Sequence, residues 1–159
     1  MANSITTHTT FTTKTVISSA AMNTNFINVI SGAPFWQKYT VDFSDVNTTT
    51  ASHTATVYSL DPKEHILSYT VKHNTAFVGG SISDVKVSLG IAGDNTKHAY
   101  DFDVNQAVGD TVFNQTDLNL IESFANTTTI YAKFSTTGAN LDSLTAGSVD
   151  IWVLKNLLP

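Results

Sequence analysis

The sequence of 159 residues contains no cysteine and no arginine, and only 13% of its residues are charged. Without cysteine, neither a disulfide nor a thiolate nucleophile is available. The charged fraction is about half of the usual ~25%, so most of the polar surface must come from uncharged side chains. Threonine supplies about one residue in six, and its branched Cβ favours strands. This composition fits an extracellular or particle-bound β protein better than a cytoplasmic enzyme.

The missing arginine also bears on binding partners. Lysine and arginine together number 8, all of them lysine, and the formal net charge is −5. Arginine is the usual bidentate partner of phosphate and guanine, and the lysines form no cluster, so we expect no nucleic-acid partner. No apolar run is long enough to span a bilayer. We therefore expect no membrane partner. The N-terminal residues lack the basic start and apolar core of a secretory signal, so we expect none.

Two regions differ in composition. Residues 1–33 are threonine-rich, and Ile5, Phe11 and Ile17 share one parity with threonine between them. Such a face has little apolar area to bury, so we interpret this region as an extended arm that can become a strand against a neighbour. An ordinary edge strand is an equally good interpretation. Gly32 and Pro34 are residues typical of a chain break between structural elements. We therefore predict that residues 34–159 form one compact domain.

The stretch at residues 84–104 gives the strongest structural signal. Apolar residues alternate strictly with polar ones from Asp84 to Ile91, as in a strand with one buried and one wet face. After Ala92–Asn95 the alternation resumes and predicts that His98, Tyr100, Phe102 and Val104 share a face. We expect a β-hairpin with a four-residue connection.

Similar strand signals recur along the chain with turn residues between them. They cover residues 35–43, 53–60, 65–73, 127–136 and 148–158, whereas residues 118–124 could form a short helix. This spacing is typical of an antiparallel β-sandwich or jelly roll. The sequence therefore predicts an all-β fold of about eight strands.

The last predicted strand is apolar on both faces. Val149, Ile151 and Val153 alternate with Asp150, Trp152 and Leu154. A strand of this kind is buried on both sides, or one of its sides meets another chain.

The sequence offers no clear catalytic or metal-binding set. His65, His73 and His98 lie in predicted strands beside aromatic residues, and no Gly-x-Ser-x-Gly motif is present. Asp94, Asp101 and Asp103 do not have the spacing of a calcium loop, so solvated carboxylates at a strand edge are the better interpretation. We expect no catalytic residues, no metal and no cofactor.

Aromatic residues leave a second function open. Phe35, Trp36 and Trp152 could form a platform on which a sugar stacks. Aromatic residues are also enriched at subunit contacts. Binding of cell-surface glycans by a tail or fibre module is therefore the alternative function.

Several phrases taken together carry a resemblance to a known group of proteins. They are Gly90–Lys97 (GIAGDNTK), Phe102–Val104 (FDV), Gln106–Val108 (QAV), Thr137–Leu141 (TGANL), Thr145–Leu154 (TAGSVDIWVL) and the closing Leu157–Pro159 (LLP). In this order they resemble small virion structural proteins of tailed bacteriophages, some of which look like capsid decoration or cement proteins. The resemblance covers residues 39–159, and its motifs are structural.

The resemblance implies a non-enzymatic virion protein, assembled in the host cytoplasm, that decorates and stabilises a capsid. Its implied partners are the major capsid protein and other copies of itself, with a trimer expected at the threefold positions of a shell. We expect the contacts with capsid or sister copies to be made by apolar residues near the two ends of the chain: Phe11, Phe35, Trp36, Trp152, Leu154, Leu157 and Leu158.

Overall fold

The computed structural model describes residues 33–108, 112–115 and 124–157. The predicted arm except Ala33, together with Phe11 and Leu158, lies outside these residues, as does the possible helix at 118–124 except Phe124. The division of the chain into arm and domain therefore stays a prediction.

The described residues form an all-β protein, as predicted. No helix within these ranges is long and apolar enough to cross a membrane. The elements in chain order are β1 (Phe35–Asp42), the 3-10 turn η1 (Phe43–Asp45), β2 (Ser52–Leu60), β3 (Glu64–Val78), β4 (Asp84–Ile91), β5 (Asp94–Asp103), β6 (Val112–Gln115), β7 (Thr128–Thr137), the 3-10 turn η3 (Leu141–Ser143) and β8 (Ala146–Leu157).

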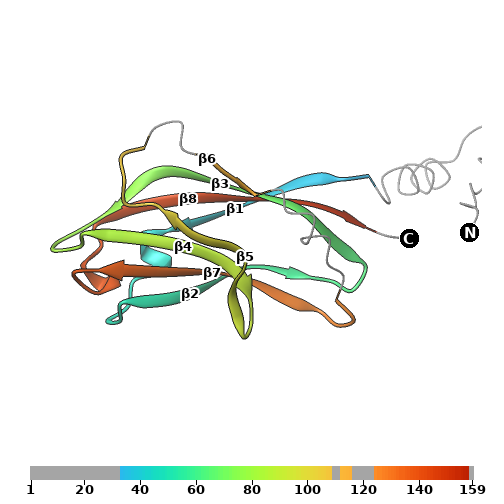
Figure 1. Cartoon of the computed structure of the whole chain (residues 1–159), viewed down its shortest axis with the longest axis horizontal. Coiled ribbons are helices and arrows are strands. Elements are labelled where there is room, and N and C mark those ends of the chain that lie inside the picture. The colour runs from blue at the N-terminus through green and yellow to red at the C-terminus, as the bar shows by residue number, and fades with distance from the viewer. Residues whose placement is uncertain (1–32, 109–111, 116–123, 158–159) are drawn as a thin grey trace, which may run out of the picture.

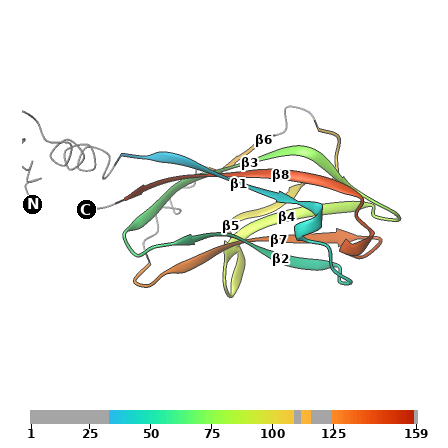
Figure 2. The same ribbon diagram turned by 180° about the vertical axis from the view of Figure 1, so that it is seen from behind.

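These strands form two four-stranded antiparallel sheets, in the orders β1-β8-β3-β6 and β2-β7-β4-β5. Figures 1 and 2 show the sheets packed face to face. Strand β1 pairs with β8, β2 with β7, β3 with β6 and β4 with β5. This is the pattern of one long hairpin rolled into two layers. It confirms the predicted sandwich and identifies it as a jelly roll.

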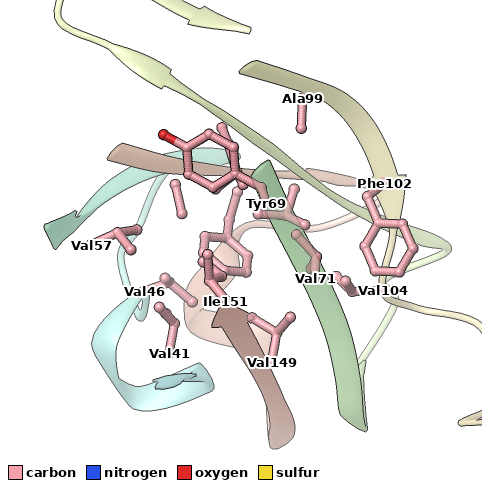
Figure 3. Close-up of a cluster of buried hydrophobic side chains, with 14 of the residues drawn as sticks. Val41, Val46, Val57, Tyr69, Val71, Ala99, Phe102, Val104, Val149 and Ile151 are labelled. Atoms are coloured by element: carbon pink, nitrogen blue, oxygen red, sulfur yellow. The ribbon is translucent and has the colours of Figure 1, made fainter. Parts of the chain in front are cut away.

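The core lies between the inner faces of the two sheets, and part of it is drawn in Figure 3. Alternation predicted its members correctly in the last two strands. Ile130, Ala132 and Phe134 of β7 are fully buried, and so are Val149 and Ile151 of β8. Each apolar run places its dry face toward the opposite sheet because successive side chains of a strand point to opposite sides.

The β4–β5 hairpin differs from its prediction in two ways. Ile91 pairs with Asp94, so the connection has two residues instead of four, with Gly93 at a φ of 87°. An extra residue then interrupts β5, and Asp101 takes a φ of 49°. The Asp101 N–H donates to Ser88 Oγ at 3.3 Å. This bulge turns Tyr100 outward, where it is 68% exposed, so the prediction that it faces the core was wrong.

Candidate functional site: the outer face of the β1-β8-β3-β6 sheet

Strand β8 has apolar side chains on both of its faces, one toward the core and one toward the outside of the sandwich. It occupies the interior of its sheet, between β1 and β3. Because Ile151 and Val153 point into the core, Trp152 and Leu154 project from the outer side of the same sheet, where both are half-buried. This is the side on which the sequence predicted a contact with another chain.

The pairing register brings a second tryptophan to this outer side. Trp36 of β1 is the direct partner of Leu154, and Thr70 of β3 is the direct partner of Trp152. Trp36, Thr70 and Trp152 line a cavity of about 320 Å³. Trp36 is 47% exposed. We call Trp36, Thr70, Trp152 and Leu154 the tryptophan face.

Charged groups lie directly beside the tryptophan face. Asp150 Oδ1 accepts a hydrogen bond of 2.6 Å from Thr40, and Lys38 Nζ lies 3.4 Å from Asp150 Oδ2. Burial alone raises the pKa of Asp150, but hydrogen bonds from Thr40 and Asn74 and the charge of Lys38 together hold that pKa below its usual value. Lys38 Nζ also lies 5.9 Å from the centre of the Trp152 ring. An apolar patch with a charged rim has the composition of a protein interface.

The predicted contact residues fall into three groups. Trp36, Trp152 and Leu154 come together on the tryptophan face. Phe35 has the opposite parity, and its ring lies 5.3 Å from Lys155 Nζ at the end of the sandwich. Leu157 is the last residue of β8, but its side chain is outside the description, as are Phe11 and Leu158.

The histidines considered as catalytic candidates have structural positions. His73 is fully buried, and this burial lowers its pKa, while a backbone hydrogen bond with Thr75 and the charge of Asp103 partly oppose the shift. His98 is also buried, with its ring 5.3 Å from the ring of Tyr69 in the opposite sheet. These contacts fit packing within the core.

The three carboxylates considered as metal ligands are occupied by local hydrogen bonds. Asp94 accepts from the Thr96 backbone N–H at 3.2 Å, and Asp103 accepts from the Asn105 N–H at 2.9 Å. Asp101, in the bulge, accepts from the Ser88 hydroxyl at 3.4 Å. Each carboxylate thus stabilises the turn or bulge in which it lies.

Sequence reasoning missed a buried ion pair at the end of the sandwich. Lys155 Nζ lies 2.7 Å from Glu64 Oε1 and also hydrogen-bonds the Tyr58 hydroxyl. Burial, and secondarily the charge of Glu64, raise the pKa of the nearby Tyr39 to about 12. The only sequence signal was the parity of Lys155, which places it on the dry side of β8 after Val153. Nothing local identifies Glu64 as its partner, because the two residues are 91 positions apart.

Comparisons with known proteins add a similarity of fold. No protein-family model matches the sequence, and no curated protein matches it. A chain of a solved structure described as the cyanophage Pam1 capsid asymmetric unit superposes with a TM-score of 0.59 at 20% sequence identity. The match covers 81% of this chain and 87% of that chain, so the two chains are similar in length. At this identity the match shows that the two chains share a fold.

Proposed function

We propose that this protein is a non-enzymatic structural component of a bacteriophage virion. The observation that carries the proposal is the shared fold with a chain that belongs, by its description, to a phage capsid. The match spans most of both chains, so it concerns the whole jelly roll and not a local motif. The sequence resemblance to small phage virion proteins supports the same class of protein.

Within the virion, we propose that the protein decorates and stabilises the shell as a homo-oligomer, with a trimer as the expected form. The tryptophan face supports a role in assembly because two tryptophans and Leu154 are only partly covered within one copy. Tryptophans placed in this way are common energetic centres of protein interfaces. The face therefore contacts either a sister copy or the major capsid protein.

Mass spectrometry of purified particles tests the decorating role. A decoration protein should be present in a fixed, high ratio to the major capsid protein, and it should be lost or retained as whole oligomers when particles are washed. Absence from the particles, or presence at only a few copies, would remove the decorating role. Measuring the solution mass of the full chain at several concentrations tests the oligomer separately.

The cavity between the two tryptophans favours one second candidate, a tail or fibre module that binds cell-surface glycans. Indole rings beside a hydroxyl and a charged rim can stack on a sugar and bond its hydroxyl groups. This candidate predicts hits on a glycan array and a change of tryptophan fluorescence when the sugar binds. A silent array, together with fluorescence unchanged at saturating sugar, would reject it.

A further inference from the structure

The four edge strands of the two sheets differ in how they are protected from pairing with another chain. Strand β5 carries four charged residues and a bulge, and β6 has only four residues. Strand β1 carries Lys38 and Asp42. Charges, bulges and short length are the usual ways in which an edge is blocked. Strand β2 is nine residues long and contains no charged residue and no proline.

In the described residues, no charge, proline or bulge interrupts β2 between Ser52 and Thr56, although the Ser52 carbonyl at its start accepts a hydrogen bond of 2.7 Å from the Thr50 hydroxyl. Within the described part of the chain, β2 pairs only with β7. Its register becomes irregular only after Thr56, so the stretch Ser52–Thr56 is regular. Thr54 and Thr56 are exposed. We call the side of Ser52–Thr56 that faces away from β7 the β2 edge.

The ladder register shows which backbone groups the β2 edge offers. The Thr136 N–H donates to the Ala51 carbonyl at 2.8 Å. Ala51 and Thr136 are therefore a hydrogen-bonded pair. Hydrogen-bonded and non-hydrogen-bonded pairs alternate along an antiparallel ladder, so His53, two residues later, also directs its N–H and C=O toward β7. Thr54 and Thr56 direct theirs away, where an added strand can bond them.

We propose that residues 5–13 of a second copy of this chain add to the β2 edge as an extra strand. These nine residues include six threonines, and like β2 they contain no charge, proline or glycine. The proposal rests on the self-association in the proposed function and specifies where the predicted arm docks.

The two faces of residues 5–13 fit the two surfaces beside the β2 edge, which are the outer face of the sheet and the seam between the two sheets. The even-numbered residues, such as Thr10 and Thr12, would lie beside the exposed Thr54 and Thr56, where cross-strand threonine pairs are favourable. The odd-numbered face carries Ile5 and Phe11. It would cover the seam between the two sheets.

That seam offers apolar surface to the odd-numbered face. Tyr39, Ala55 and Tyr58, from β1 and β2, pack against the core but are only partly buried. An added strand that carries Ile5 and Phe11 would complete their burial.

Chain direction and length favour a second copy as the donor. Phe35 pairs with Lys155, whose Nζ bonds Tyr58 near the end of β2, so β1 begins beside the end of β2. If the arm of the same chain lay along β2 and then led directly into β1, it would have to finish beside the end of β2 and so run parallel to it. Parallel pairing is slightly weaker than antiparallel pairing. Residues 14–32 can span up to roughly 60 Å when extended, which allows the arm to reach a neighbour and pair antiparallel.

Three proline variants of the full chain test this pairing. Thr54→Pro removes an N–H that points away from β7 and so leaves the β2–β7 ladder intact. In the arm, Thr9→Pro and Thr10→Pro are made separately, because one of the two must remove an N–H that faces β2. Thr54→Val and Thr10→Val are the matched controls, since valine keeps the N–H and the branched shape. We expect Thr54→Pro and one arm variant to weaken association roughly tenfold or more, measured by sedimentation, and the valine variants to leave it unchanged.

Amide hydrogen exchange of the wild-type chain gives a second measurement, which does not require any variant to fold. We expect the Thr54 and Thr56 amides to become protected as concentration rises through the association range. A wild-type chain that associates without this protection overturns the docking proposal alone. A chain that stays monomeric overturns the proposed self-association as well.

Two other results identify a different occupant of the β2 edge, and each overturns the proposal. Protection that is already complete in dilute monomer assigns the edge to the arm of the same chain. Loss of association in Thr54→Pro but in neither arm variant assigns it to β2 of the second copy.

Discussion

Lys155 and Glu64 form a buried ion pair, with 2.7 Å between Nζ and Oε1, at the end of the sandwich where β1 begins. The side chains of Lys155 and Glu64 are only 6% and 9% exposed, respectively. The second Glu64 oxygen accepts the Asp61 N–H at 3.0 Å, which fixes the turn before β3. One pair thus joins β8 to the start of β3.

Removing one partner of this pair should be costly. Lys155→Met leaves the Glu64 charge buried without its partner and should lower the free energy of unfolding by about 3–5 kcal/mol. The double variant Lys155→Met/Glu64→Leu should recover most of that loss. Lys38→Met removes the half-exposed partner of Asp150, which keeps its hydrogen bond from Thr40, and should cost less than Lys155→Met. Urea unfolding measures all three, and a double variant as unstable as the single one would contradict this account.

Truncating the tryptophan face should weaken association and leave the fold intact. Trp152→Ala should reduce the association free energy by at least about 2 kcal/mol, since a central tryptophan is a common energetic centre of an interface. Tyr100→Ala, at an equally aromatic but distant and exposed position, serves as the control and should change nothing. If association survives but binding to capsid shells is lost, the face contacts the shell. If both persist, the face is not an interface.

Acid should destabilise the protein through His73. Burial lowers the pKa of His73 from 6.5 in the folded state, so the unfolded chain binds a proton that the folded chain does not. Stability is therefore present above pH 6.5 and is lost as pH falls below it, by at most about 1.4 kcal/mol per pH unit. His73→Leu should lose stability less steeply over this range, while the two slopes agree at higher pH. Urea unfolding at each pH measures both stabilities. If the wild type and His73→Leu lose stability equally steeply below pH 6.5, His73 is not the group responsible.

Adding a methyl group at Gly90 should disturb the β4–β5 hairpin. A Cβ at this position would lie 2.1 Å from the Asp94 carbonyl oxygen, a backbone atom that cannot move away alone. Gly90→Ala should therefore cost about 1–3 kcal/mol. Gly93→Asn is the control, because space is open around Gly93 and asparagine tolerates its φ of 87°. Thermal unfolding compares the two variants, and equal midpoints would be the contrary result.

Strand faces could be predicted from sequence wherever the ladder stays regular. The buried positions of β7 and β8 follow from simple alternation. Prediction failed where an extra residue enters the ladder, as at Tyr100, because a one-residue shift exchanges the two faces. Simple alternation over residues 65–73 likewise predicts that Leu67 shares the face of Tyr69, but the register is irregular between Ile66 and Ser68, and Ile66 is the residue that is buried.

The candidate site was only partly predictable for a related reason. The outward position of Trp152 and Leu154 follows from the two-sided pattern of one strand. That Trp36 joins them depends on the register between β1 and β8, which pairs Trp36 with Leu154 across more than a hundred positions of sequence. Local patterns contain no information on such pairings.

The rolled-hairpin pairing of the strands also affects synthesis of the protein. Strand β8 lies between β1 and β3, so the earliest strands to leave the ribosome lack the neighbour that holds them together until residue 157 has been made. Pairings between strands far apart in the sequence form slowly. A translation product that ends before β8 would lack an interior strand of the β1-β8-β3-β6 sheet. Prematurely terminated chains would therefore lack the strand that carries Trp152 and Leu154, and under the proposed function they could not join the assembly.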